Sequence, residues 1–501
     1  MVRQVRKQER AGVRRRVRPT PGAQQERSAM SLQAGYAMCD ITPAIGCPMD
    51  GYGARDHGST GLEDRLQARV LVLESDGGAV CFVCTDLLGV DEETADQVRQ
   101  RGSEGTELSV EQIMVCASHT HFGPCYRRRA YLPPSLADLV SEEYRLNMVN
   151  AIAGAIEEAW GALQPARVGW NTTRAHGLTF NRRPVDDEGN TQMRLVLEAP
   201  AAVAASRAGA ELADAWPKGG YGGPRLSAPI PEMENLHAGV TDNEAPLLRV
   251  DTAEGEPLAA LVTFACHAVV GRGDGYDISA DYPGQARWAF EHIVGGRMLF
   301  AAGCAGDQVP TWRREDSRER VGRALGAQAA KAWYEVPELV DALPIGTISR
   351  TVEIPVPEGY VTAEQARQML REAGDEDSAE ARQARSLLEK AEEVGGRTSI
   401  PRPIWAARVG DVGFVGLPGE VLVEIGLQIK QRSPFPITHV CSLTNAYVGY
   451  LCTDRAIREG GYEPGRGTIM FNLNGPGTEA ALVETGLAML RELHGGGENN
   501  C

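Results

Sequence analysis

Short apolar runs alternate along this chain with longer stretches in which apolar residues recur at helical spacing. The runs at 68–73 and 79–84 flank an Asp-Gly-Gly turn, which predicts a β-hairpin. Further strands are predicted over 113–117, 258–264, 298–302, 412–417 and 438–443, and helices over 91–101 and 141–160. The alternation predicts an α/β fold with mixed β-sheets, flanking helices on the outer faces and a site at one rim.

Two stretches interrupt the pattern and are interpreted as insertions. Residues 199–230 are rich first in alanine and then in glycine and proline, which is typical of a mobile loop. Residues 361–396 are dense in Ala, Glu and Arg, and predict a charged helical hairpin that acts as a lid, a dimer surface or a solvated excursion. We expect a single large catalytic domain over 31–493 and a disordered tail over 494–501.

Charge is distributed unevenly along the 501 residues. The chain is 43% hydrophobic with a formal net charge of -16, which suits a large core and argues against nucleic acid as a partner. Residues 1–30, however, hold nine Lys and Arg against two Glu. This basic tail is interpreted as disordered, or as sequence ahead of a start at Met30; the alternatives are a transit peptide and a nucleic-acid arm. No run reaches the roughly 20 apolar residues of a membrane span, so no stable membrane insertion is expected.

The eleven cysteines are scattered, and several lie inside apolar runs: Cys81, Cys84, Cys266 and Cys441. Such a distribution is typical of buried free thiols in a reducing compartment, so a cytoplasmic location is expected. The gap between Cys81 and Cys84 also suits a metal or redox pair, but a strand would place them on opposite faces.

Four apolar runs lead into residue types that bind metals. They are S-H-T-H at 118–121, F-A-C-H-A at 264–268, G-L-P-G-E at 416–420 and N-A-Y-V-G-Y at 445–450. Strand ends bring distant segments to one rim, and two imidazoles, a carboxylate and an open position form a hydrolytic zinc site. Such a site lowers the pKa of bound water.

Each of these side chains also has a structural interpretation when taken alone. His119 and His121 lie two residues apart and would share a face in a strand, but a hydrogen-bonded pair in a loop has the same spacing. His267 and Tyr450 alone are typical of core residues, and Glu420 of a helix N-terminal carboxylate. Their recurrence together favours a shared site.

Two further stretches are candidates for the same site. In A-A-G-C-A-G-D-Q-V-P at 301–310, small residues allow the backbone to approach another segment closely, and Asp307 follows at the turn. In F-N-R-R-P at 180–184, an arginine pair suits recognition of a carbonyl or carboxylate. The alternatives are a plain turn residue for Asp307 and a surface salt bridge for Arg182.

Taken in order, the motifs resemble the N-terminal catalytic domain of the neutral/alkaline non-lysosomal ceramidase family. The matching pieces span about 34–465: A-G-Y-A-M-C-D-I-T-P (34–43), G-Y-G-A-R-D-H-G-S-T-G-L (51–62), A-S-H-T-H-F-G-P (117–124), F-N-R-R-P, F-A-C-H, the G-D turn at 306–307, G-L-P-G-E, and N-A-Y-V-G-Y with the later G-G-Y-E.

The resemblance implies a zinc-dependent hydrolase. Carried over residue by residue, the family's zinc ligands fall on His119, His267, Glu420 and Tyr450. The twelve residues from Tyr450 to Tyr462 favour Tyr450 over Tyr447 as the ligand. The same comparison makes His121 a second active-site histidine, Arg182 a substrate-facing arginine and Tyr462 a residue near the bound substrate.

Three departures from the family bear on the substrate. The family's G-D-V-S-P-N, whose serine is implicated in catalysis, is G-D-Q-V-P-T here, so Val309 stands at the serine position. No counterpart of the family's C-terminal immunoglobulin-like domain is expected, and neither is a secretion signal or an apolar segment for lipid extraction.

These departures favour a hydrolase that cleaves a linear amide, or an ester, in a small or medium polar substrate rather than in ceramide. His121 or Asp307 is expected to assist proton transfer, while Arg182 orients the acyl or polar end. The alternatives are a true ceramidase or N-acyl lipid amidase, and a catalytically silent metal-binding scaffold. A homo-oligomer is compatible with the sequence.

Overall fold

The computed structural model describes residues 31–495 apart from 76–77, 131, 216–225, 232, 272, 314–316, 377 and 466–472. The basic segment 1–30 and most of the predicted C-terminal tail lie outside the described residues. Helix α11 (Thr478–Gly495) includes the first two residues of that predicted tail. The helical pattern of the last element therefore continues further than the expected boundary.

The larger sheet has eight strands in the order β13-β11-β10-β6-β1-β3-β4-β5. In chain order they are β1 (Gln33–Asp40), β3 (Gln67–Ser75), β4 (Gly78–Thr85), β5 (Ile113–Ala117), β6 (Gln164–Arg174), β10 (Glu244–Thr252), β11 (Pro257–Phe264) and β13 (Arg297–Ala302). The pairs β4–β5 and β11–β13 are parallel and the others antiparallel. The sheet is mixed, as predicted, and β3 and β4 form the predicted hairpin.

The second sheet has four strands in the order β15-β16-β17-β19. They are β15 (Ile345–Pro355), β16 (Ser399–Val409), β17 (Val412–Gly416) and β19 (Ile437–Cys441), of which β17 and β19 are parallel. Four small strand pairs are also present: β2 (Gly61–Leu62) with β12 (Asp277–Ile278), β7 (Thr179–Asn181) with β14 (Gln308–Pro310), β8 (Ala228–Pro229) with β9 (His237–Ala238), and β18 (Glu420–Val421) with β20 (Tyr450–Leu451).

Alternate residues of the central strands belong to different hydrophobic cores, and this shows the order in which sheets and helices are stacked. In β3, Val70 packs among helices while Leu71 faces the second sheet. In β16, Trp405 faces the first sheet and Ala406 faces α9 and α11. The order of layers is therefore helices, eight-stranded sheet, four-stranded sheet, helices. The outer helices on the first side are α1 (Glu92–Glu104), α3 (Glu142–Gly161), α5 (Asp281–Val294) and α6 (Ser317–Tyr334), and on the other side α9 (Val423–Arg432) and α11.

Local signals in the sequence explain where two of these helices begin. The side chain of Asp91 accepts a hydrogen bond from the backbone of Thr94 and caps α1. Ser141 caps α3 in the same way through Tyr144. Because these oxygens satisfy N–H groups that have no partner within the helix, both predicted starts are confirmed.

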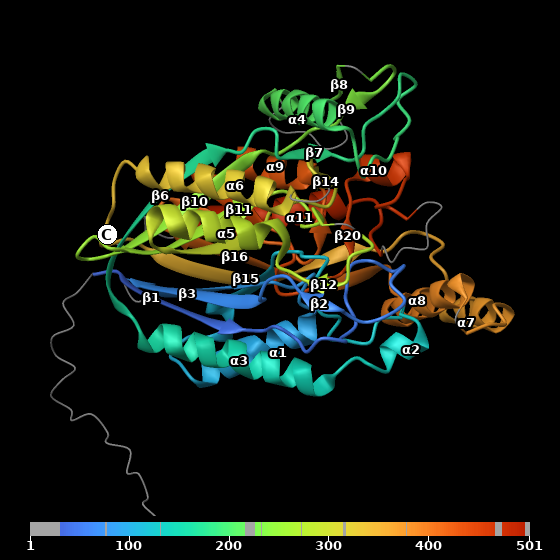
Figure 1. Ribbon diagram of the computed structural model, residues 1–501, viewed down its shortest axis with the longest axis horizontal. Coiled ribbons are helices and arrows are strands. Elements are labelled where there is room, and N and C mark those ends of the chain that lie inside the picture. The colour runs from blue at the N-terminus through green and yellow to red at the C-terminus, as the bar shows by residue number, and fades with distance from the viewer. Residues whose placement is uncertain are drawn as a thin grey trace, which may run out of the picture.

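The prediction was wrong for part of the first insertion and confirmed for the second. The Ala-rich part of 199–230 is not a loop but a helix, α4 (Ala199–Asp214), because alanine has the highest helix propensity and buried alanines of α4 pack on Phe180. The Gly/Pro-rich part falls mostly on residues outside the described range. Residues 361–396 form a hairpin of two helices, α7 (Ala363–Glu372) and α8 (Ala379–Val394). In Figure 1 this hairpin projects from the right-hand end beside α2 (Pro134–Ala137).

Buried cysteines are confirmed as free thiols at all four positions named from the sequence. Cys81 packs among the helices and Cys84 between the sheets, so the two do not form a pair. Two short helices complete the described fold: the 3-10 helix η1 (Val110–Gln112) and α10 (Asp454–Glu459).

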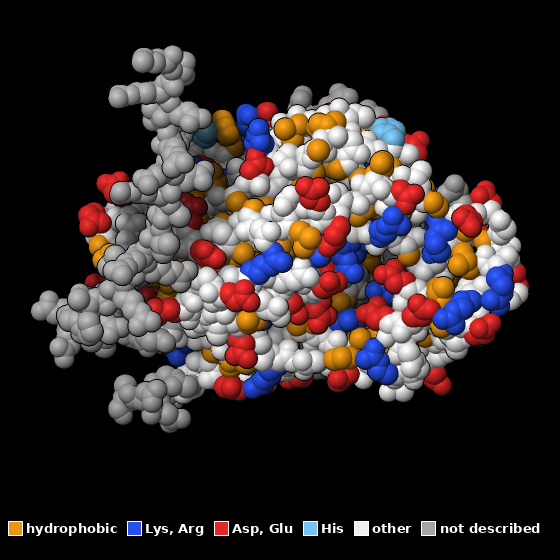
Figure 2. All heavy atoms as spheres, turned by 90° about the horizontal axis from the view of Figure 1, so that it is seen from below, with side chains coloured by type: hydrophobic (Ala, Val, Ile, Leu, Met, Phe, Trp, Pro, Cys, Tyr) orange, Lys and Arg blue, Asp and Glu red, His pale blue; other side chains and the backbone are white. Residues whose placement is uncertain are grey.

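Charged side chains of both signs intermix on the face shown in Figure 2. Its right-hand end, where α7 and α8 lie, carries both basic and acidic residues. Among the described residues, none of the helices combines the length and the apolar character that crossing a membrane requires.

Replacement of Trp405 by alanine tests the interface between the sheets. The indole is 1% exposed, packs edge-on against Phe82 with ring centroids 6.2 Å apart, and donates from Nε1 to the carbonyl of Glu111 at 2.8 Å. We expect Trp405→Ala to lower the free energy of unfolding by about 3–5 kcal/mol, measured by urea titration. The matched control is Trp288→Ala, at a tryptophan that is 47% exposed, which should cost less than about 1 kcal/mol. Equal losses would contradict the layer arrangement.

His439 predicts a pH dependence of stability. Burial, with a contribution from Lys430, lowers the pKa of His439 from 6.5 to about 3. Its ring stacks on Phe414 and its Nδ1 contacts Thr263 Oγ1 at 2.8 Å. Between these two pH values the unfolded chain binds a proton at this residue that the folded chain does not, so stability falls as the pH is lowered from about 6.5 towards about 3.

His439→Gln removes this contribution, so the wild type should lose stability more steeply than the variant over that pH range. The measurement is the free energy of unfolding of both proteins from pH 8 to pH 4 by urea titration, about the range in which histidine titrates. Parallel pH profiles for the two proteins would contradict the prediction.

Candidate metal centre

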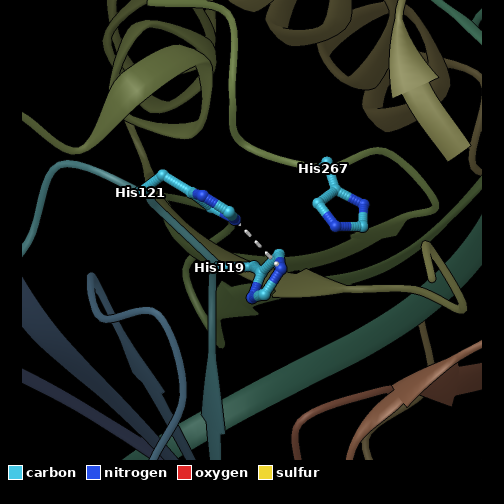
Figure 3. Close-up of side chains that lie close together, drawn as sticks. All are labelled: His119, His121 and His267. Carbon is cyan, nitrogen blue, oxygen red and sulfur yellow. Dashed lines mark hydrogen bonds between the residues drawn. The ribbon is translucent and has the colours of Figure 1, made fainter. Parts of the chain in front are cut away.

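The two histidines of S-H-T-H converge through a bend of the backbone. β5 ends at Ala117, before either histidine, and His119 has a left-handed φ of 65°. The prediction that both lie on one face of a strand was therefore wrong, because the strand ends too early. Figure 3 shows the rings of His119, His121 and His267 facing one another. Nε2 of His119 lies 3.3 Å from Nε2 of His121.

Asn445 connects the end of β5 to the loop that carries the two candidate tyrosines. Its side-chain oxygen accepts from the backbone N–H of Val115 at 2.9 Å, and its own N–H donates to the Val115 carbonyl at 2.8 Å. Asn445 has a left-handed φ of 58°, which asparagine tolerates better than most residues. This bridge fixes the position of N-A-Y-V-G-Y relative to S-H-T-H.

Backbone carbonyls determine which ring nitrogen of two histidines carries the proton. Nδ1 of His119 lies 2.7 Å from the carbonyl oxygen of Leu88. Nδ1 of His267 lies 2.6 Å from that of Ala305 and 3.1 Å from that of Gln308. A carbonyl only accepts hydrogen bonds, so Nδ1 is the donor in both rings and Nε2 presents its lone pair to the site.

The turn at 301–310 brings backbone close to the site, as predicted. A Cβ at Gly306 would lie 2.7 Å from the carbonyl oxygen of Glu420 and 2.9 Å from that of Val421. Only glycine allows this approach. The small residue therefore lets the turn that holds His267 pack against the strand that holds Glu420.

Glu420 joins the two histidines in one cluster. Its Oε2 lies 3.2 Å from Nε2 of His119 and 3.2 Å from Nε2 of His267. Its Oε1 accepts a hydrogen bond from the hydroxyl of Tyr447 at 2.7 Å. Burial would raise the pKa of Glu420, but the two histidines outweigh it and hold this pKa well below the ordinary value.

This cluster has the chemistry of a cation site. Burial lowers the pKa of His267 to about 4, so the ring is neutral at pH 7 and its Nε2 is an acceptor that faces the acceptor Oε2 of Glu420. Two acceptors at hydrogen-bond distance repel each other unless a proton or a cation lies between them. The nitrogen donors of His119, His121 and His267 all lie within 4.8 Å of one another. The residues present therefore fit a divalent metal ion.

His121 differs from the other two histidines in its hydrogen bonds. Its Nδ1 is buried and has no hydrogen-bond partner among the described residues, while its Nε2 faces Nε2 of His119 at 3.3 Å. Burial, and then the neighbouring His119 and His267, lower the pKa of His121 well below 6.5. A Cβ at Gly51 would lie 2.6 Å from its Cγ, so glycine at 51 makes room for the ring.

The two tyrosines of N-A-Y-V-G-Y have different partners. Tyr450 pairs with Glu420 across the parallel strands β18 and β20, and its hydroxyl accepts a hydrogen bond from Arg182 Nη2 at 3.0 Å. Burial outweighs Arg182 and raises the pKa of Tyr450 well above 10. The sequence spacing to Tyr462 favoured Tyr450 over Tyr447 as the ligand, but Tyr447 is the tyrosine that hydrogen-bonds Glu420. The role of Tyr450 as a metal ligand stays a prediction.

Arg182 belongs to a buried ionic cluster rather than to a surface salt bridge. Its Nε donates to Oε1 of Glu463 at 2.8 Å, and Arg183 donates to Oε2 of the same carboxylate at 2.5 Å. Arg182 reaches the site through its hydrogen bond to Tyr450. Glu463 was not singled out from the sequence, although it ends the quoted motif G-G-Y-E. A substrate-facing role for Arg182 stays a prediction.

Three donors hold the carboxylate of Asp307. Its carboxylate accepts from the backbone N–H of Val423 at 2.9 Å, from Asn181 Nδ2 at 2.9 Å and from Gln308 Nε2 at 3.3 Å. These bonds tie the turn after β13 to the start of α9. The expected part of Asp307 in proton transfer stays a prediction. Val309 is fully buried against Phe180 in the cluster under α4.

A cavity of about 380 Å³ opens beside the histidine cluster. His121, Glu420, Tyr447, Tyr450 and Tyr462 line one part of it. Tyr462 packs edge-on against Tyr450 with ring centroids 5.7 Å apart. Of the predicted site residues, His121, Glu420, Tyr450 and Tyr462 line this cavity, and His119, His267 and Arg182 contact them directly.

Comparison with known proteins confirms the family resemblance over the N-terminal part of the chain. Residues 32–193 match the family model described as neutral/alkaline non-lysosomal ceramidase, N-terminal. A neutral ceramidase from Mycobacterium tuberculosis is 24% identical over 281 residues, which cover 54% of this chain and 37% of that protein. A neutral ceramidase from Pseudomonas aeruginosa is 22% identical over 520 aligned residues, which cover 90% of this chain and 70% of that protein.

Solved structures confirm the fold class. The crystal structure of neutral ceramidase from Pseudomonas aeruginosa superposes with a TM-score of 0.66 at 21% identity, over 93% of this chain and 74% of that one. A ceramidase complexed with C2 superposes with a TM-score of 0.67 at 19% identity, over 93% and 75%. The fold is therefore the mixed α/β fold of neutral ceramidase.

Removal of His267 tests the metal centre. We expect the purified protein to hold about one zinc per chain, and His267→Ala to lose it, because the variant lacks an Nε2 donor fixed by two carbonyls. The measurement is metal content by mass spectrometry after dialysis and re-addition of zinc. The matched control is His292→Ala, at an exposed histidine of α5. Metal retained in His267→Ala, or absent from the wild type, would contradict the assignment.

Proposed function

Since residues 32–193 match the family model described as neutral/alkaline non-lysosomal ceramidase, N-terminal, we propose that this chain is a zinc-dependent hydrolase that cleaves a linear amide, or an ester, bond. The observation that carries the proposal is the contact between Oε2 of Glu420 and the Nε2 atoms of His119 and His267, each at 3.2 Å. Two imidazoles and a carboxylate arranged in this way can bind a cation. Nitrogen and oxygen donors together favour zinc.

Four residues would hold the metal in this proposal: His119, His267, Glu420 and Tyr450. The first three already contact one another, and Tyr450 is the strand partner of Glu420. When bound, zinc polarises a substrate carbonyl and lowers the pKa of a coordinated water. Tyr447 acts as a positioning residue, because its hydroxyl orients the carboxylate of Glu420.

His121 is the proposed group for proton transfer. It lines the cavity, its depressed pKa keeps the ring unprotonated at neutral pH, and its Nδ1 has no hydrogen-bond partner among the described residues. The ring can therefore accept a proton from the attacking water and return it to the leaving group. Arg182 holds the hydroxyl of Tyr450, and Tyr462 would contact the substrate.

The second candidate function is that of a true ceramidase or N-acyl lipid amidase. The names of the relatives favour it, and Leu88 and Val448 supply apolar surface to the cavity beside the three tyrosines. The charged side chains elsewhere in the cavity, Arg129, Arg382 and Lys390 among them, would suit a substrate with a polar end instead. An assay with ceramide, N-acyl amino acids and simple esters separates these candidates.

Replacement of His121 by glutamine tests the proposed chemistry. We expect kcat on the best amide of that set to fall by about 10²–10⁴-fold, because the variant cannot accept the proton. Zinc content should stay at the wild-type value, which separates a loss of proton transfer from a loss of metal. His292→Gln serves as the control. Activity that survives both zinc chelation and His121→Gln would contradict the proposal, and bound zinc without turnover of any amide or ester would favour the scaffold alternative.

A further inference from the structure

One face of α8 forms a wall of the cavity beside the candidate metal centre. The side chains of α8 that line it recur every three or four residues: Ala379, Arg382, Gln383, Ser386, Glu389 and Lys390. This spacing places them on a single face of the helix. Tyr450, from strand β20, lines the same cavity. The predicted charged hairpin is therefore part of the cavity rather than a separate excursion.

The cavity has two chemically different walls. The wall next to the histidines carries the rings of Tyr447, Tyr450 and Tyr462. The wall formed by α8 carries alanine as its only apolar residue, and its remaining side chains are charged or hydrogen-bonding. A substrate that fills the cavity therefore meets aromatic surface near the candidate centre and polar groups further out.

Basic side chains exceed acidic ones in this outer region. Arg129, Arg382 and Lys390 line the cavity together with Asp50 and Glu389, while Glu420 belongs to the metal cluster. The carboxylate of Asp50 is already engaged by Arg129 at 3.5 Å and by the N–H of Gly51 at 3.0 Å. Glu389 is exposed to solvent, and Lys390 donates to Glu393 at 2.8 Å, so Arg129 and Arg382 are the groups of this region whose several N–H donors suit a negatively charged ligand.

Arg129 lies close to the candidate centre, and the wall that carries Arg382 is anchored beside it. The guanidinium of Arg129 lies 5.4 Å from the centroid of Tyr447, the tyrosine that orients Glu420. Arg385 of α8 donates to the carbonyl of Ala130 and, at 2.7 Å, to that of Glu376. The contact with Ala130 joins α8 to the segment that carries Arg129, and the contact with Glu376 lies within the hairpin.

We propose that the substrate is an amide whose outer end bears a carboxylate or phosphate group, bound by Arg382 and Arg129, and that α8 is the specificity element of the site. Planar guanidinium groups match both anions through paired hydrogen bonds. This inference rests on the proposed hydrolase function for its chemistry, but the binding that it requires can be measured without turnover.

The test compares three amides that share one acyl chain: N-dodecanoylglycine, N-dodecanoylphosphoethanolamine and the neutral N-dodecanoylethanolamine. We expect kcat/KM to be about 10-fold higher for at least one anionic amide than for the neutral one, mainly through KM. The anionic amide that is preferred identifies the group as carboxylate or phosphate. In Arg382→Gln the ratio of anionic to neutral kcat/KM should fall about 10-fold, because one guanidinium is lost.

The matched control is Arg367→Gln on α7, which removes the same charge from the same hairpin. Arg367 pairs with Glu392 at the surface and does not line the cavity. Circular dichroism of both variants checks that the helices persist. A wild-type ratio near one, or an equal change in the two variants, would overturn the proposal.

Calorimetric binding of the same amides separates this inference from the proposed function. Preferential binding of an anionic amide that weakens in Arg382→Gln but not in Arg367→Gln supports the inference even if no amide is hydrolysed. Hydrolysis of all three amides without preference, and with equal binding, keeps the hydrolase proposal and overturns this one.

Discussion

The carboxylate of Glu420 lies between the Nε2 atoms of His119 and His267, and only a proton or a cation between these groups makes such short distances favourable. Carbonyl groups of Leu88 and Ala305 fix the protons of His119 and His267 on the far side of each ring. The hydroxyl of Tyr447 holds the carboxylate from its other oxygen. Such an arrangement is unfavourable by itself, so folding energy from elsewhere maintains it.

That energy comes from the layers on which the site is built. Each sheet buries one face against the other sheet, and helices cover the two outer faces. The segments that carry the candidate metal ligands follow the ends of the packed strands. There His119 and Asn445 adopt left-handed backbone conformations. Non-glycine residues are rare in this region of backbone space, and here they cluster beside a candidate site.

Regular elements were predictable from the sequence, whereas the bends between them were not. The β3–β4 hairpin and the starts of α1 and α3 follow from alternation and from the capping residues Asp91 and Ser141. The approach of His121 to His119 depends on the positive φ of His119, which no local sequence pattern predicts. Tyr447 contacts Glu420 and Glu463 contacts Arg182 only because the fold brings distant segments together. The identity of a single residue does not predict such a contact. The Ala-rich stretch of α4 was misjudged because composition suited a loop as well as a helix.

Asn445 has a consequence beyond the site. β5 is the last strand of the eight-stranded sheet, and such strands offer unpaired backbone groups to other chains. The two hydrogen bonds between Asn445 and Val115, together with the bridge between Thr444 and Cys116, occupy part of that edge with a segment from far along the chain. The loop that presents the candidate tyrosines thus also shields a sheet edge from aggregation, and this protection exists only after the C-terminal part of the chain has folded.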